Sequence, residues 1–96
     1  MPISITLGNF TEQGIKNIKE SPKRAKAFME MAKKHGVTVR GLYYTMGQYD
    51  LVTISEGSED ALHALALSVG KLGNVRTTTL PAMELEAMQR VLEKVS

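Results

Sequence analysis

The sequence predicts an α+β sandwich, in which a four-stranded antiparallel sheet carries two helices on one face. The first observation is the order of strand-like and helix-like segments, which is βαββαβ followed by a C-terminal helix. That order is the one of the ferredoxin-like fold. The second observation is size. A chain of 96 residues without cysteine has room for one small domain, at residues 1–96, and for no disulfide.

The first strand and the first long helix are predicted at the start of the chain. Residues 3–7 alternate apolar with polar side chains, which is the pattern of a strand with one apolar face. A short helical turn is expected over residues 11–19. Ser21-Pro22 then begins a long helix that ends at Gly36, because serine is a good N-cap and proline is tolerated in the first turn. The apolar stripe of this helix consists of Ala25, Phe28, Met29 and Ala32.

A β-hairpin is predicted in the middle of the chain. Residues 37–45 and 50–56 are rich in β-branched and aromatic residues. The turn between them, Met46-Gly47-Gln48-Tyr49-Asp50, contains the glycine that tight turns favour. Since Tyr43 and Tyr44 lie just before it, this turn gathers the tyrosines of the chain beside a carboxylate.

The second half of the chain predicts a helix, the fourth strand and a terminal helix. Ser58 is the expected N-cap of a helix that ends at Gly70 to Gly73, and residues 75–80 form the strand. Pro81 is expected to begin the terminal helix. The apolar side of this helix exceeds what the sandwich needs, so we expect it to pack on a neighbouring subunit. That side consists of Leu85, Met88, Leu92 and Val95.

The sheet face away from the helices is the part of the fold that matters most for function. We expect Ser4, Thr6 and part of the run Thr77 to Thr79 on this face. Such residues are too polar for the core of a monomer and too uncharged for a well-solvated surface. A second subunit is the simplest cover, so the expected partner is the chain itself, as a homodimer or larger homo-oligomer.

Charge and composition argue against several classes of function. The net charge of +2, from 12 basic and 10 acidic residues, does not indicate nucleic-acid binding. His35 and His63 are far apart and cysteine is absent, so we expect no metal site. No dinucleotide- or phosphate-binding loop is present, so we expect no cofactor. Without a segment suited to a leader or a membrane span, we expect a cytoplasmic protein with no membrane partner.

Seven basic residues fall within residues 16–34, in the region of the first helices. We interpret them as the solvated outer face of an amphipathic helix, with an anion-binding surface as the alternative. They are Lys16, Lys19, Lys23, Arg24, Lys26, Lys33 and Lys34.

Two stretches, Val39–Asp50 and Gly73–Leu80, resemble the GYD domain family, and the element order agrees over essentially the whole chain. The resemblance implies a GYD-type ferredoxin-like domain that pairs sheet to sheet as a dimeric α/β barrel. It leaves the chemistry open. The wider group includes cofactor-free monooxygenases, haem-handling enzymes, isomerases and stress-induced proteins, so function has to be argued from residues.

The hairpin turn contains the main candidate residues. Gly47 is expected to supply a positive φ, and Asp50 to close the turn by accepting hydrogen bonds from backbone N–H groups. The functional alternative places Tyr49 and Asp50 at the mouth of a pocket, with the carboxylate as general base or ligand acceptor and the phenol as its orienting group. His35 is the third catalytic candidate, with capping of the helix end as the alternative.

The strands supply further candidate ligand contacts. Tyr43 and Tyr44 are adjacent, so they point to opposite faces of the sheet, and each is a candidate for ligand contact or for packing. Arg40 and Arg76 lie on strands and need a carboxylate, water or an anionic ligand, with an intersubunit salt bridge as the alternative for Arg76. The candidate ligand-binding set is therefore Tyr43, Tyr44, Gly47, Tyr49, Asp50 and Arg76.

The sequence is consistent with two main functions, and nucleic-acid binding through the basic helix ranks last. The first is a homo-oligomeric structural or small-ligand-binding and sensing module without catalysis, which the small number of acid–base groups favours. The second is a cofactor-independent enzyme, similar to a monooxygenase or isomerase, acting on a small aromatic or acidic metabolite. The second hypothesis needs an enclosed pocket in which the tyrosines, Asp50 and His35 converge.

Overall fold

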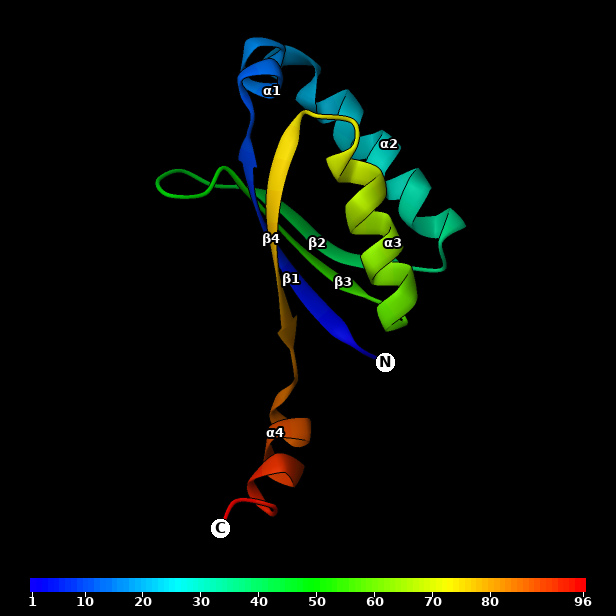
Figure 1. Cartoon of the computed structure of the whole chain (residues 1–96), viewed down its shortest axis with the longest axis vertical. Helices are drawn as coiled ribbons and strands as arrows, with labels where there is room; N and C mark the ends of the chain where they lie inside the picture. Colours follow the sequence, from blue (N-terminus) through cyan, green and yellow to red (C-terminus); the bar gives the residue numbers. More distant parts are fainter.

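The computed structural model describes residues 1–96 and contains one antiparallel sheet of four strands, in the order β2-β3-β1-β4. The strands are β1 (Ile3–Phe10), β2 (Thr38–Tyr44), β3 (Leu51–Glu56) and β4 (Val75–Ala82). The helices are α1 (Glu12–Lys16), α2 (Ser21–Lys34), α3 (Glu59–Gly70) and α4 (Leu85–Leu92), with a 3₁₀ turn at Ile18–Glu20. Helices α2 and α3 lie next to each other over one face of the sheet (Figure 1). The predicted ferredoxin-like α+β fold is confirmed.

Serine residues lie at the starts of both long helices, but only one of them is a cap. Ser58 caps α3 as predicted, since its side chain accepts a hydrogen bond from Ala61 N. The prediction that Ser21 caps α2 is wrong, because Ser21 is the first residue of the helix and is buried. Its hydroxyl pairs with the Tyr44 hydroxyl at 2.8 Å instead. The start of α2 is thereby attached to the end of β2.

The helix-facing side of the sheet carries the hydroxyl residues, which is the reverse of the prediction. Ser4, Thr6, Thr77 and Thr79 line a cavity together with residues of α2 and α3, so they point toward the helices. The placement of Ser4 and Thr6 on the face away from the helices is therefore wrong. Part of the threonine run, Thr78, does face away as predicted. Strand pairing sets Thr6 beside Thr79 on one side and beside Thr53 of β3 on the other.

The open side of the sheet, which no helix covers, carries the apolar residues of the same strands. Successive side chains of a strand point to opposite faces, so the residues between the hydroxyls face outward. Ile5 pairs with Ile54 and with Leu80, and Leu7 pairs with Val52, which makes two apolar rows across the sheet. We call this surface the open face.

The position of the large side chains explains how helices can cover a hydroxyl-bearing face. Phe10, Leu51 and Val75 lie together at one end of the sheet, since Phe10 pairs with Val75 and Gly8 pairs with Leu51. Val39 packs against the buried cluster near the other end. The helices therefore meet apolar residues toward both ends of the sheet, whereas the centre presents short hydroxyl side chains that leave space beneath the helices.

The buried core is small. Its buried apolar residues are Ala32, Val37 and Leu65, and no large side chain is completely buried. A chain of this size buries only a modest share of its surface, so each further apolar contact contributes noticeably to stability. The open face and the C-terminal helix leave further apolar side chains without cover in the isolated chain.

The last strand runs further than predicted. Pro81 does not begin the terminal helix; it lies in β4, which extends to Ala82, and it pairs with Ser4. Proline fits there because β4 is an edge strand, on which a missing N–H group can face outward. Helix α4 begins only at Leu85, without a side-chain cap.

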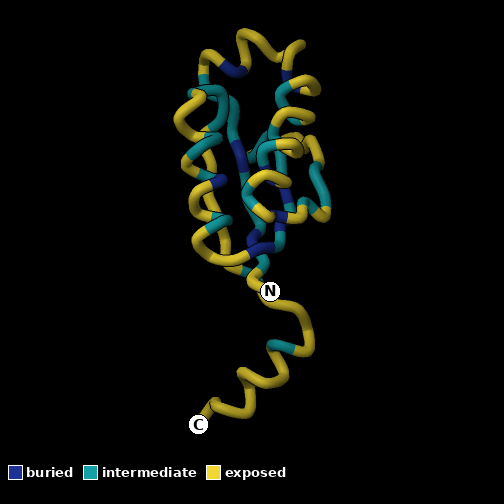
Figure 2. Tube along the Cα trace, turned by 90° about the vertical axis from the view of Figure 1, so that its right-hand side faces the viewer, coloured by how far each residue is buried: buried dark blue, intermediate teal, exposed yellow.

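Residues 83–96 form a C-terminal arm that leaves the body of the molecule (Figure 1). All of them except Ala87 are exposed (Figure 2). One ion pair holds the base of the arm: Arg40 Nη1 lies 2.8 Å from Glu84 Oε1 and 3.7 Å from Glu56 Oε2. Arg40 lies on edge strand β2, at a register shift, and Glu84 follows the opposite edge strand, so the pair spans the sheet.

We predict that Gly14→Ala destabilises the fold, because a Cβ at buried Gly14 would overlap the carbonyl oxygen of Asn74. The free energy of unfolding in urea should fall by about 1–3 kcal/mol. Gly70→Ala is the matched control, since Gly70 is also helical but has open space around it, and it should be neutral or stabilise by up to about 1 kcal/mol. Equal effects of the two substitutions would contradict the close approach at Gly14.

Candidate ligand-binding cavity

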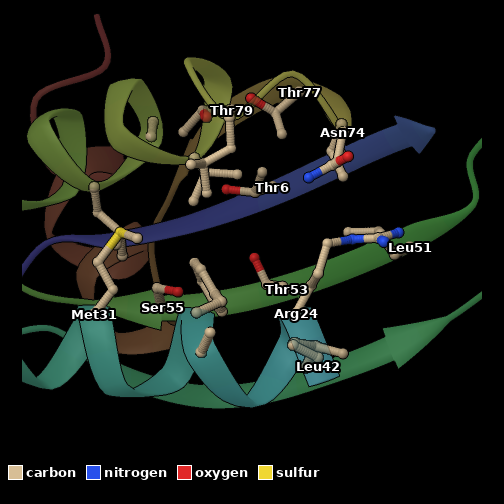
Figure 3. Close-up of a pocket in the computed structure, with 18 of the residues that line it drawn as sticks. Thr6, Arg24, Met31, Leu42, Leu51, Thr53, Ser55, Asn74, Thr77 and Thr79 are labelled. Atoms are coloured by element: carbon tan, nitrogen blue, oxygen red, sulfur yellow. The ribbon is translucent and has the colours of Figure 1, made fainter. Parts of the chain in front are cut away.

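A cavity of about 180 Å³ lies between the sheet and helices α2 and α3 (Figure 3). Its floor is formed by six hydroxyl residues of the sheet: Ser4, Thr6, Thr53, Ser55, Thr77 and Thr79. Its roof is formed by apolar residues of the two helices: Ala25, Phe28, Met31, Leu62, Leu65, Ala66 and Val69. The lining surface is thus mostly apolar, and the hydroxyls of the floor supply its hydrogen-bonding groups.

The six floor hydroxyls are free to bond to an occupant of the cavity. None of them takes part in a side-chain hydrogen bond within the chain. No fully enclosed side-chain oxygen or nitrogen lacks a partner, so these hydroxyls open onto the cavity. Because these hydroxyls are accessible, they are available to hydrogen-bond to polar groups of a bound molecule.

One end of the cavity carries its only charged residue. Arg24 extends from α2 toward Leu51 and Asn74 (Figure 3). Its Nη1 donates to Asn17 O at 3.0 Å and its Nη2 to Gly14 O at 3.4 Å, and no carboxylate lies within 4.0 Å of it. The guanidinium is therefore positioned by backbone carbonyls and keeps its charge uncompensated.

Of the tyrosines expected to contact a ligand, Tyr44 lines the cavity and Tyr43 does not. The two side chains point to opposite faces, as the alternation along a strand requires. Tyr44 pairs with Ser21 at the edge of the cavity. Tyr43 lies on the open face, with its ring over Gly41, and is 59% exposed.

Of the remaining hairpin candidates, Asp50 joins the end of the turn to β1, and Tyr49 takes part in the turn through its backbone carbonyl. Asp50 Oδ2 accepts a hydrogen bond from Phe10 N at 2.9 Å, and Asp50 N donates to Gly8 O at 2.9 Å. Thr45 Oγ1 donates to Tyr49 O at 2.6 Å, and Gly47 has a φ of 104°. Neither Tyr49 nor Asp50 lines the cavity. Their catalytic roles stay predictions, because neither side chain faces the cavity in which a substrate could bind.

His35 and Arg76 lie apart from the cavity and from each other. His35 follows the last turn of α2, and its Nδ1 lies 3.1 Å from Met31 O, which corresponds to the capping alternative. Arg76 is exposed on the open face and forms no ion pair within the chain. The structure therefore does not bring Tyr49, Asp50 and His35 together in one pocket.

The ion pair at the base of the arm involves the other strand arginine, Arg40. Its hydrogen bond to Glu84 raises the pKa of Arg40, with the charge of Glu84 adding to the effect and that of Glu56 contributing less. A raised pKa stabilises the charged form, and this contribution is lost only when the pH rises through the pKa of arginine. Arg40 therefore stays charged near neutral pH, and the ion pair is not lost there through its deprotonation.

The sequence carries a signal for the hydroxyl floor, but the prediction assigned it to the wrong face. Serine or threonine recurs at alternate positions in three neighbouring strands: Ser4 and Thr6, Thr53 and Ser55, Thr77 and Thr79. Such a pattern indicates that these residues share a face. The alternation within a strand shows which residues share a face. It does not show which of the two faces the helices cover, because that depends on how the connections leave the sheet.

The ionisable side chains of the cavity lining are Arg24 and Tyr44. No Asp, Glu, His or Lys lines the cavity, so it holds no carboxylate or imidazole to act as a general base. The structure contains no group of three or more His, Cys, Asp or Glu residues that could hold a metal ion. It also has no helix with the length and apolar character that a membrane span requires.

Comparison with known proteins identifies the family. The model of the GYD domain family matches residues 5–92, which takes in all four helices. The chain belongs to the GYD domain family. The resemblance seen in the hairpin and the last strand is thus confirmed. No curated protein matches this GYD domain significantly.

Solved structures share the fold of this GYD domain at low sequence identity. The crystal structure of FFRP-DM1 gives a TM-score of 0.63 at 17% identity, covering 86% of this chain and 100% of that one. The hypothetical protein PHS023 from Pyrococcus horikoshii gives 0.63 at 17%, covering 88% and 92%. The leucine response regulatory protein LrpA of Mycobacterium tuberculosis gives 0.58 at 19%, covering 86% and 51%. At these identities the likeness concerns the fold alone.

We predict that Asp50 is required for stability of the GYD domain. Asp50→Ala leaves Phe10 N without its acceptor and should lower the free energy of unfolding by about 1–3 kcal/mol. Asp50→Asn keeps an oxygen that can accept the bond and should retain most of the stability. Urea denaturation of the three proteins measures the difference, and an Asp50→Ala protein as stable as the wild type would count against the role in the turn.

Proposed function

We propose that this GYD domain is a homo-oligomeric module that binds and senses a small molecule in the cavity between the sheet and helices α2 and α3. The observation that carries the proposal is the row of unpartnered hydroxyls facing an apolar roof. Small-molecule sites in proteins are concave and mostly apolar, with a few polar groups that fix orientation, and this cavity has that composition.

The size of the cavity suits a small ligand. An apolar cavity of about 150 Å³ accommodates benzene, and one water molecule occupies about 30 Å³. A volume of about 180 Å³ therefore corresponds to a molecule of one ring with small substituents, or to a short branched chain. Such a ligand would replace the missing partners of the floor hydroxyls and complete the small core.

The choice of binding over catalysis rests on the absence of a general base from the cavity lining. A cofactor-independent enzyme would have to rely on Tyr44 or a hydroxyl, since Tyr49, Asp50 and His35 do not reach the cavity. A regulatory role is also consistent with the fold, because one solved structure that shares it belongs to a protein named a leucine response regulatory protein.

The binding proposal is tested by filling the cavity. Ala66→Leu places a larger side chain in the roof, and Ala64→Leu is the matched control, because Ala64 is exposed on the same helix. Native mass spectrometry of the purified wild type should show a small molecule bound at one per chain. The Ala66→Leu protein should lack it, and the Ala64→Leu protein should retain it.

Two results would overturn the binding proposal. The first is a ligand that remains bound to Ala66→Leu as tightly as to Ala64→Leu. The second is a wild-type protein that carries no molecule and whose cavity amides show no NMR response to small ring compounds. Chemical conversion of the bound molecule by the pure protein would favour the enzyme hypothesis over the sensing module.

The homo-oligomer is part of the same proposal and rests on the open face. The apolar rows around Ile5 and Leu7 lie outside the helices, and the apolar side of α4 contacts no other element closely. Apolar surface removed from water contributes roughly 25 cal/mol per Å², which favours covering both with a second copy. Arg76, without an ion pair in its own chain, would then be available for one between subunits.

We predict that a charge on the open face dissociates the assembly. Leu80→Lys puts an ammonium into the row of Ile5 and Ile54, and Leu67→Lys is the matched control on the outer side of α3. Light scattering should give a lower mass for Leu80→Lys only. Truncation after Met83, which removes α4 but leaves β4 intact, should also lower the mass. Unchanged masses in Leu80→Lys and in the truncated chain would exclude this interface.

A further inference from the structure

We propose that the ligand of the cavity is an anionic ring compound, a monocyclic aromatic carboxylate, with its carboxylate on Arg24 and its ring between the threonine floor and the apolar roof. The inference rests on the proposed binding function and adds the chemical class of the ligand. It is carried by the charge, the unused donors and the position of Arg24, together with the shape of the space beside it.

Arg24 is built to receive an anion at one end of the cavity. A guanidinium has five N–H donors, of which Arg24 uses one toward Asn17 O and one toward Gly14 O. The two carbonyls fix the orientation of the side chain and leave the other donors available. Because no carboxylate of the chain lies within 4.0 Å, a ligand carboxylate would be its first counter-ion, and arginine binds carboxylates through paired hydrogen bonds.

The space next to Arg24 suits a flat, mostly apolar body. Phe28, about one turn after Arg24 on α2, provides an aromatic ring, and Met31 provides a thioether toward the other end of the cavity (Figure 3). Both groups pack well against aromatic ligands. Opposite them, Thr6 and Thr53 lie side by side on neighbouring strands (Figure 3). Their hydroxyls can bond to polar substituents on the ring, while their methyl groups contact its face.

The same lining argues against other classes of ligand. Cations and free amino acids carry a positive group, for which the cavity offers no carboxylate. Inorganic phosphate or sulfate would find one guanidinium and a large apolar wall, which leaves most of its oxygens unbonded. A neutral ring compound would fit the space but would leave Arg24 without a counter-ion.

Three probes separate these possibilities. Benzoate has the ring and the charge, benzamide has the ring without the charge, and acetate has the charge without the ring. In an NMR titration of the wild-type protein, benzoate should shift the amide resonances of Thr6 and Thr53 saturably. Benzamide should bind about tenfold more weakly, and acetate should not shift these resonances.

Two variants assign the charge dependence to one side chain. Arg24→Gln should weaken benzoate binding about tenfold and leave benzamide binding unchanged. Lys23→Gln, the neighbouring exposed position, removes the same charge from the surface and should change neither. If Arg24→Gln fails to fold because α1 loses its two hydrogen bonds, the ratio of benzoate to benzamide affinity in the wild type still decides the matter.

The outcomes distinguish this inference from the binding function on which it rests. Equal affinities for benzoate and benzamide, or equal effects of Arg24→Gln and Lys23→Gln, would overturn the anionic ligand and leave the cavity as a binding site for neutral molecules. No response to either ring compound, together with a wild-type protein that carries no bound molecule, would overturn both. Benzoate binding that Arg24→Gln alone weakens supports both.

Discussion

The phase of the side-chain alternation in the sheet is the constraint on which the rest of this structure depends. With Thr6 and Thr53 turned toward the helices, their neighbours Ile5 and Ile54 must turn away from them. Two consequences follow from this one choice. A cavity with hydroxyls on its floor is left inside the chain, and an apolar surface is left outside it. The candidate site and the candidate interface are therefore opposite faces of the same three strands.

This arrangement leaves the isolated chain with a small apolar core. Only three apolar residues are buried, and the centre of the sheet contributes hydroxyls where an ordinary core would have branched hydrocarbon. An open cavity leaves the side chains that line it incompletely packed. In so small a domain, a binding site therefore reduces the apolar area that is buried on folding. Cover on the open face would offset that loss without closing the site.

The sequence predicted the elements well and the three-dimensional use of their faces poorly. Local signals such as Ser58 before α3 and the glycine in the hairpin turn act over a few residues, so they can be recognised in the sequence alone. Pro81 was misassigned because an edge strand tolerates proline as readily as a helix start does, and only the strand order decides between them. Arg24 lay within a basic run that predicted a solvated face. Arg24 differs from the other basic residues because it donates hydrogen bonds to Gly14 O and Asn17 O, and these contacts form only in the folded chain.

The two edge strands bear on how copies of this chain can associate. Open edges offer rows of unpaired N–H and C=O groups, from which sheets grow by adding strands, and natural proteins interrupt them with bulges, charges or proline. Strand β2 is interrupted by the register shift at Arg40, and β4 carries Pro81 near its end. Lateral growth of the sheet is disfavoured at both edges, while the apolar surface lies on a face. The register shift and the proline therefore disfavour the continuous strand ladders from which fibrils are built.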